Sequence, residues 1–392
     1  MNQKILHTPE GLRDIYGAEC ESKLILEQRL GEVFSAYGYR DIETPAFEYF
    51  DVFGREIGTI PSKDLYKFFD REGNTLVLRP DFTPSIARAV SRYWKDSKDP
   101  VRLCYRGRTF INHSSLQGRL KENTQMGAEL IGEGSVDADA EIIAMATEAM
   151  LRSGLKKFQI SLSDVAFFES LVAEAAIDSD TVERLRELIR NHNTFGAGKL
   201  LDSLKIDPKI SQILKKLPLL TGGEEILHEV LAMSKGLRAQ EAVERLKDVL
   251  ELLKLYGLSD YISFDFGMLS SYMYYTGIIF RGYTYGTGDA VVKGGRYDTL
   301  LAHFGKKAPS IGFVITIGTL MSALSRQNIE ILPEKKRCLI VYGEGMNREA
   351  ILKAQEYRAQ GRCVEIMKLA DDRTDEQLRE SGGYDAVVRL KG

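Results

Sequence analysis

A charged, leucine-rich block in the middle of the chain constrains the fold more than any other feature. Residues 178–257 contain few β-branched runs and include TVERLRELIRNHN and AQEAVERLKDVLELLKLYG. Leu, Glu and Lys favour helices. Strand-like segments return after the block, at YISFDFGML, YYTGIIFRGYTYG and DAVVKGG. We therefore predict a helical insertion at about 178–257, inside a larger core that mixes helices and strands.

The residues before the insertion alternate between helix and strand signals. Apolar residues recur at helical spacing between Glu19 and Tyr37, which predicts a helix there. KFFDREGNTLVL predicts two strands around an EGN turn, and VRLCYRGRTFI and TQMGAELIG predict two more. ADAEIIAMATEAMLR predicts a helix capped by Asp137 or Asp139.

The residues after the insertion predict further elements of the core and then a separate tail. RYDTLLAHFG predicts a helix, SIGFVITIG a strand and TLMSALSRQ a short helix. A boundary is predicted near 329–336, at IEILPEKK. The sequence beyond it predicts strand, helix, strand, helix and strand, which indicates a small α/β domain at 334–392.

Composition excludes several classes of protein. The 392 residues carry a net charge of −3, so no global positive field would draw the chain to nucleic acid. The four cysteines lie far apart without a CxxC pair, which argues against a zinc site or a disulfide framework. No window approaches 18 uncharged apolar residues, and the N-terminus has no apolar signal region. We therefore expect a cytoplasmic protein without a membrane partner.

One acidic and one hydroxyl side chain lie between a predicted strand and a predicted helix in LRPDFTPSIARAV. Asp81 and Thr83 there could receive the ammonium or ring N–H of a ligand. The alternative is that they cap the helix that follows.

A second pair of polar side chains lies on the predicted strand TQMGAELIG. Gln125 and Glu129 are four residues apart and therefore point to the same side of a strand. Such a pair is a plausible receptor for an ammonium or imidazole group. The alternative is the solvated face of an antiparallel sheet.

An uncharged aromatic stretch, MLSSYMYYTG, precedes a glycine turn, GGRYD, at 294–298. On a strand, Tyr272 and Tyr274 would share one face, and Met273 and Tyr275 the other. Tyrosines have an apolar body and a polar tip, which suits the wall of a pocket. The alternative is a strand with packed aromatic side chains. The paired glycines permit close approach of the backbone.

Over about residues 5–325 the chain resembles the catalytic core of the histidyl-tRNA synthetase family. The resemblance rests on segments that recur in the same order: TPEGLRD, GYRDIETPAFE, LRPDFTPSIARA, TFI…GR…QMGAE, YYTG, GGRYDTLLAHFG and SIGF. It implies an α+β fold with a class II aminoacyl-tRNA synthetase-like core at 1–328, whose sheet is mostly antiparallel. Residues 334–392 resemble a shortened anticodon-binding domain. The family also implies a homodimer whose interface includes Glu43, Thr44 and Phe47. The alternative interpretation of this segment is an ordinary surface strand.

Three arginines that the synthetases use at their nucleotide site are replaced in this chain. Ile111 stands where the second class-defining motif has the arginine that grips phosphate and carboxylate. Thr319 stands where the third motif ends in an arginine that holds ATP, and Ser270 replaces the arginine that opens the tyrosine segment. Removing one such donor typically costs about 10²–10³ in rate. We therefore expect that the chain does not form adenylate and has no catalytic residues.

The positions that hold histidine in the synthetases keep suitable residues, with Asp81 in place of a glutamate. They are Asp81, Thr83, Gln125, Glu129, Tyr274 and Tyr275. A kept histidine pocket beside a lost nucleotide site resembles the regulatory-subunit family of ATP phosphoribosyltransferase. That resemblance implies a hetero-oligomer with a short catalytic subunit, for the first step of histidine biosynthesis. It implies histidine as an allosteric feedback ligand, and no cofactor or metal.

The resemblance leaves two alternative functions. The first is a tRNA-binding or tRNA-sensing accessory protein, and the second is an active histidyl-tRNA synthetase. The lost arginines argue against the synthetase. Residues 334–392 carry 12 Lys and Arg against 11 Asp and Glu, so the tail has no strong positive charge for RNA.

Overall fold

The computed structural model describes residues 6–54, 60–113, 120–270, 274–331, 336–368 and 373–390. The chain divides into two compact units. The first comprises residues 1–16 and 26–330, and the second comprises residues 17–25 and 331–392.

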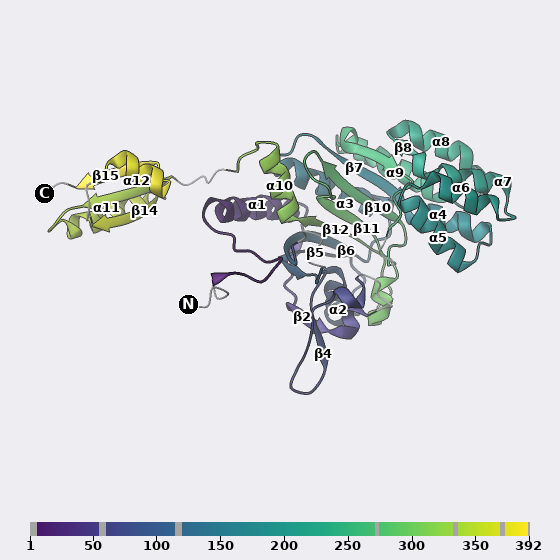
Figure 1. Ribbon diagram of the computed structural model, residues 1–392, viewed down its shortest axis with the longest axis horizontal. Helices are drawn as coiled ribbons and strands as arrows, with labels where there is room; N and C mark the ends of the chain where they lie inside the picture. Colours follow the sequence, from purple (N-terminus) through teal and green to yellow (C-terminus); the bar gives the residue numbers. More distant parts are fainter. Residues whose placement is uncertain are drawn as a thin grey trace. The chain divides into compact units, whose positions relative to one another are not determined.

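A nine-stranded sheet forms the centre of the first unit as the structure describes it, in the order β1-β5-β6-β12-β11-β10-β7-β9-β8. Neighbouring strands from β5 to β7 are antiparallel, whereas β1 with β5 and β7 with β9 are parallel pairs. The mostly antiparallel sheet that the sequence predicted is therefore confirmed (Figure 1). The strands are β1 (Arg40–Asp41), β5 (Val101–Phe110), β6 (Glu122–Ile131), β7 (Phe158–Asp164), β8 (Thr221–Gly222), β9 (Ile262–Asp265), β10 (Ile278–Thr284), β11 (Val292–Arg296) and β12 (Ser310–Thr316).

Helices cover both faces of this sheet. Successive side chains of a strand point to opposite faces, and the helices bury the apolar side chains on each face. One face packs against α1 (Gly17–Ala36), where the ring of Phe34 meets the ring of Phe313 edge-on at 5.6 Å. Two more helices, α3 (Val136–Arg152) and α10 (Ile317–Arg326), also contact the sheet. On the other face, α2 (Thr83–Tyr93) buries Phe82 and Ile86 with Leu103 and Tyr105 of β5.

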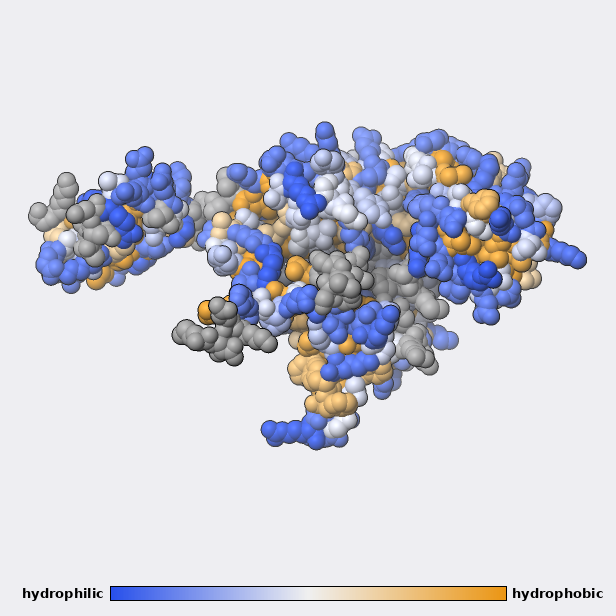
Figure 2. Space-filling view, in the orientation of Figure 1, coloured by the Kyte–Doolittle hydropathy of each residue, from blue (hydrophilic) through white to orange (hydrophobic). Residues whose placement is uncertain are grey.

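A second, three-stranded sheet lies beside α2 in the order β2-β4-β3 (Figure 1). Its strands are β2 (Phe47–Tyr49), β3 (Lys67–Phe69) and β4 (Thr75–Leu78), all antiparallel. Hydrophobic residues gather on the surface of this sheet (Figure 2), where Phe47 and Phe69 are exposed. The predicted hairpin around the EGN turn is confirmed as β3 and β4. Short 3₁₀ turns, η2 (Phe50–Phe53) and η3 (Ser62–Asp64), flank these strands.

The leucine-rich block is helical, as predicted, apart from the two-residue strand β8. Leading into it is α4 (Val165–Glu174), and within it lie α5 (Ser179–Arg190), α6 (Thr194–Asp202), α7 (Pro208–Lys216), η5 (Leu217–Leu219), α8 (Glu224–Ser234) and α9 (Gln240–Leu255), followed by η6 (Ser259–Tyr261). Side chains of Asp178, Asn193 and Asp207 cap α5, α6 and α7. Apolar side chains of α9 are buried at helical spacing, and α9 packs on α3 of the core.

Three local predictions about secondary structure are wrong. The helix predicted at RYDTLLAHFG is only a 3₁₀ turn, η7 (Leu300–Phe304), because Gly305 ends it with a φ of 84°. The strand predicted at YYTG is irregular backbone, and β10 begins only at Ile278. The cap of α3 is Ser135, whose hydroxyl accepts the N–H of Ala138, because Asp139 is buried in other contacts.

The second unit contains a parallel three-stranded sheet in the order β14-β13-β15, with a helix on each face. Its strands are β13 (Arg337–Tyr342), β14 (Cys363–Lys368) and β15 (Ala386–Leu390), and its helices are α11 (Asn347–Ala359) and α12 (Asp375–Gly382). Ile340 packs with Ala350 and Ala354 on one face, and Leu339 packs with Leu378 on the other. The predicted succession of elements in the tail is confirmed.

Candidate functional site

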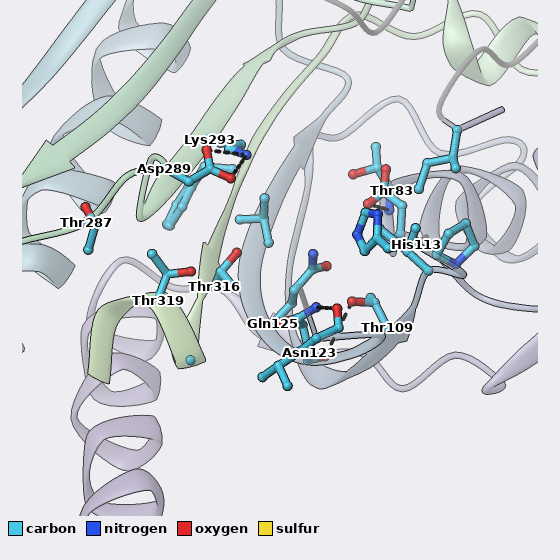
Figure 3. A pocket seen from close by; sticks show the side chains of 18 of the residues that line it. Thr83, Thr109, His113, Asn123, Gln125, Thr287, Asp289, Lys293, Thr316 and Thr319 are labelled. Carbon is cyan, nitrogen blue, oxygen red and sulfur yellow. Dashed lines mark hydrogen bonds and ion pairs between the residues drawn. The ribbon is translucent and has the colours of Figure 1, made fainter. Parts of the chain in front are cut away.

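A cavity of about 720 Å³ opens on the α2 face of the main sheet. All six side chains that were predicted to bind histidine line it, namely Asp81, Thr83, Gln125, Glu129, Tyr274 and Tyr275. Figure 3 shows Thr83 and Gln125 facing the same space, and Thr316 and Thr319 bordering its other half. The structure therefore brings together residues from α2, β6 and the loop before β10.

Glycines on three neighbouring strands make the floor of this cavity deep. Glu129 on β6 pairs with Gly312 on β12, which pairs with Gly295 on β11. A Cβ on Gly312 would lie 1.7 Å from Oε2 of Glu129, and a Cβ on Gly295 would lie 2.7 Å from the Tyr275 ring. A Cβ on Gly127 would lie 2.4 Å from the Tyr105 hydroxyl. The glycines of QMGAE, SIGF and GGRYD are thus required so that larger side chains can lie flat across the sheet.

Glu129 is the buried acid at the floor, with 1% of its surface exposed. Its Oε1 accepts a hydrogen bond from the Thr83 hydroxyl at 2.7 Å, and its Oε2 accepts one from the Tyr297 hydroxyl. Burial raises the pKa of Glu129 to about 8, although both hydrogen bonds oppose the shift. The alternative of a solvated strand face is therefore wrong for this residue.

Asp81 and Thr83 do not simply cap α2. The Thr83 hydroxyl is committed to Glu129, and the position before the helix is Phe82, which makes no side-chain cap. Asp81 does accept the backbone N–H of Thr83, at 3.3 Å. Burial raises the pKa of the Asp81 carboxyl, which lines the same cavity as Glu129.

Two buried oxygen atoms on the cavity face of the sheet have no hydrogen-bond partner among the described residues: Oε1 of Gln125, which lines the cavity, and the hydroxyl of Tyr105, which pairs with Gly127. The Tyr105 ring is fixed by stacking on Phe82, with ring centres 4.4 Å apart. Leaving a buried polar atom unpaired typically costs about 1–3 kcal/mol. An N–H group of a ligand would satisfy the Gln125 acceptor.

The loop that carries Tyr274 and Tyr275 forms a wall of the cavity. The two rings lie 4.7 Å apart, and Tyr274 meets Tyr297 edge-on at 5.9 Å. Because this loop is not a strand, the alternative of a strand with packed aromatics is wrong for these two tyrosines. Tyr272 and Met273 lie outside the described residues. Sequence reasoning missed Tyr297, although this residue belongs to the GGRYD motif.

Uncharged side chains occupy all three positions at which the synthetases carry arginine, and two of the three line this cavity. Ile111 and Thr319 both line it, whereas Ser270 is buried and is not among the lining residues described. Lys293 also lines the cavity, and its ammonium lies 3.1 Å from a carboxylate oxygen of Asp289. The site can hold a cationic or N–H-rich ligand at its acidic end.

Candidate metal clusters and membrane-spanning helices are both absent from the part of the chain that the structure describes. No group of three or more His, Cys, Asp and Glu side chains there could hold a metal ion. None of the helices described is both long and apolar enough to cross a membrane.

Comparison with known sequences places these features in context. The family model of histidyl-tRNA synthetase matches residues 11–320. The ATP phosphoribosyltransferase regulatory subunit of Acetivibrio thermocellus is 39% identical over 361 residues, covering 92% of this chain and 86% of the relative. The regulatory subunit of Thermoanaerobacter pseudethanolicus is 38% identical over 362 residues, covering 92% and 94%.

Solved structures share the fold. A protein from Bacillus halodurans, described as an ATP phosphoribosyltransferase regulatory subunit/histidyl-tRNA synthetase, matches with a TM-score of 0.88. It is 31% identical and covers 99% of each chain. The histidyl-tRNA synthetase of Nostoc matches with a TM-score of 0.81 at 20% identity, over 98% of this chain and 91% of that one, which indicates the fold alone.

Proposed function

Because the chain belongs to the family of ATP phosphoribosyltransferase regulatory subunits, built on a histidyl-tRNA synthetase-like fold, we propose that its cavity binds free histidine as a feedback signal. The chain is a non-catalytic regulatory subunit in histidine biosynthesis. Its partner would be a short catalytic subunit, which carries the chemistry. Histidine would act as an allosteric ligand, and no cofactor is needed for that role.

The single observation that carries this proposal is the acidic end of the cavity. The buried carboxyl group of Glu129 and the half-buried one of Asp81 line the same cavity as Gln125, whose Oε1 has no hydrogen-bond partner among the described residues. Histidine offers an ammonium group and an imidazole N–H, which are donors of the kind that these acceptors need. Tyr274 and Tyr275 supply an aromatic wall for the ring.

Two uncharged residues in the lining of the cavity support a binding role without adenylation. Ile111 and Thr319 cannot stabilise the charge that develops on a phosphate. Histidine would instead favour one conformation of the chain over another, and this difference would reach the catalytic subunit. A coupling of about 1–3 kcal/mol is the usual scale for such effects.

Assembly and location complete the proposal. A homodimer would form through the segment around Pro45, where Glu43 and Phe47 are exposed. Thr44 is buried, and its carbonyl accepts a hydrogen bond from Arg79 at 2.7 Å, so it would shape this segment rather than contact a second copy. The hetero-oligomer would work in the cytoplasm and without nucleic acid.

Calorimetric titration of histidine tests the proposal. We expect binding to the chain alone, or to its complex with the catalytic subunit, and loss of binding in D81N. No heat of binding in either sample would refute a histidine receptor. ATP–pyrophosphate exchange with histidine should remain at background, and measurable exchange would contradict the absence of adenylation.

A further inference from the structure

A buried carboxylate behind the cavity holds two arginines from distant parts of the chain. Asp139 of α3 is completely buried. Its Oδ1 accepts hydrogen bonds from Nε and Nη2 of Arg296 at 2.8 and 2.6 Å. Its Oδ2 accepts a hydrogen bond from Nε of Arg245 at 2.7 Å. Arg245 belongs to α9 of the helical insertion, and Arg296 ends β11.

Arg296 connects this cluster to the wall of the cavity. On β11 the neighbouring Gly295 pairs with Gly312, which lines the cavity, so Arg296 points to the opposite face of the sheet, where α3 lies. The next residue, Tyr297, again faces the cavity and donates to Glu129. Arg296 therefore fixes from behind the segment that carries Tyr297.

The tyrosine loop is attached to the same segment. The carbonyl of Arg296 accepts the N–H of Thr276 at 2.8 Å, and the Thr276 hydroxyl accepts the N–H of Asp298 at 3.0 Å. Asp298 in turn accepts Nη1 of Arg296 at 3.2 Å and the N–H of Ser310 at 2.9 Å. A shift of Arg296 would thus move the loop that carries Tyr274 and Tyr275.

The insertion enters this network through Arg245. Its Nη2 also donates to the carbonyls of Gly134 and Ser135, at 2.8 and 3.2 Å, next to the start of α3. Arg245 does not line the cavity. Because both arginines share one buried carboxylate, the position of α9 and the position of the cavity wall are set by the same group.

We propose that Arg245 is a positioning residue that couples the helical insertion to the cavity, through Asp139 and Arg296. Ligand that contacts Tyr275 and the Glu129–Tyr297 pair stabilises the arrangement in which Arg296 is seated on Asp139, and this arrangement also holds α9. Coupling between two equilibria is reciprocal. The factor by which ligand stabilises the seated position of α9 is therefore also the factor by which ligand affinity falls when α9 is released from that position. The inference rests on the proposed function, since histidine is the ligand used to test it.

The test replaces Arg245 by glutamine, which removes its charge and leaves Arg296 to pair with Asp139. R186Q is the matched control, because Arg186 of α5 pairs with Glu169 of α4 at 2.7 Å and is likewise part-buried, but it is not bonded to the cavity wall. Histidine affinity is measured by calorimetry on the full chain and on its complex with the catalytic subunit. Urea unfolding reports the stability of each variant separately.

We expect R245Q to weaken histidine binding about fivefold and R186Q to leave it within twofold of wild type. Hydrogen exchange adds a reading that a purely structural role would not move. Histidine should slow amide exchange in α9 of the wild type and of R186Q, but not of R245Q. Wild-type affinity and α9 protection in R245Q, or an equal loss in R186Q, would overturn the coupling. Absence of histidine binding to the wild type would instead overturn the proposed function, and the inference with it.

Discussion

At the scale of single residues, the site depends on an acid that the fold holds away from water. Glu129 is enclosed by Thr83 and Tyr297 and lies near a second carboxyl, Asp81. Its pKa of about 8 means that much of the free chain carries a protonated Glu129 at neutral pH. Binding of an ammonium group would then favour release of that proton.

This raised pKa predicts how stability changes with pH. Between the ordinary value of 4.5 and about 8, the folded chain keeps a proton on Glu129 that the unfolded chain has released. The free energy of unfolding therefore falls as pH rises through this window. E129Q removes this titrating group. The free energy of unfolding of E129Q, measured with urea, should therefore fall less between pH 5 and pH 8 than that of the wild type. Identical slopes in the two proteins would show that Glu129 is not protonated when folded.

The glycine floor predicts a second effect at this scale. G312A places a methyl group where Oε2 of Glu129 now lies, so it should reduce histidine affinity at least tenfold and cost about 1–3 kcal/mol of stability. G198A in α6 is the control, because a Cβ there meets nothing within 4 Å and Gly198 is not among the lining residues of the cavity. Wild-type binding by G312A would contradict the description of the floor.

Residue-level predictions from sequence succeeded where local spacing decides the geometry. Gln125 and Glu129 could be placed on one face because side chains on a strand alternate. The roles of Tyr297, Gly295 and Gly312 could not be predicted from spacing alone. They depend on β11, β12 and β6 being neighbours, and that order is set by contacts between distant parts of the chain.

At the scale of elements, periodic patterns predicted the main helices and strands, whereas end signals were less reliable. Asp137 and Asp139 looked like caps for α3, but the buried Asp139 is used to hold Arg245 and Arg296. Tertiary contacts thus override a local preference here. The YYTG segment has strand-like residues and nevertheless forms a loop, because Thr276 is bound to Arg296 and no ladder forms there.

The corrected cap gives a prediction for α3. S135A removes the hydroxyl that accepts the N–H of Ala138 and should lower the free energy of unfolding by about 1 kcal/mol. D137A should cost less, since the Asp137 carboxylate contributes only through its charge in the first turn. Thermal or urea unfolding of both variants compares the two values. A larger loss in D137A would restore the original assignment of the cap.

At the scale of the whole molecule, the resemblance to histidyl-tRNA synthetases gives the fold, and the departures from it give the role. The cavity has acidic side chains in its lining, and the uncharged Ile111 and Thr319 line it as well. A regulatory subunit needs a ligand site and a route from that site to the rest of the chain, but no reaction chemistry. The network of Asp139, Arg245 and Arg296 provides such a route within the described core.

The central claim is that histidine acts through this cavity, and inhibition of the complex by histidine measures it most directly. The catalytic subunit is assayed with wild-type chain and with E129Q over a range of histidine concentrations. We predict that the E129Q complex keeps its activity without histidine, while the concentration for half-inhibition rises at least tenfold, since a charged hydrogen bond is worth about 1.5–3 kcal/mol. Unchanged inhibition of the E129Q complex would contradict the claim.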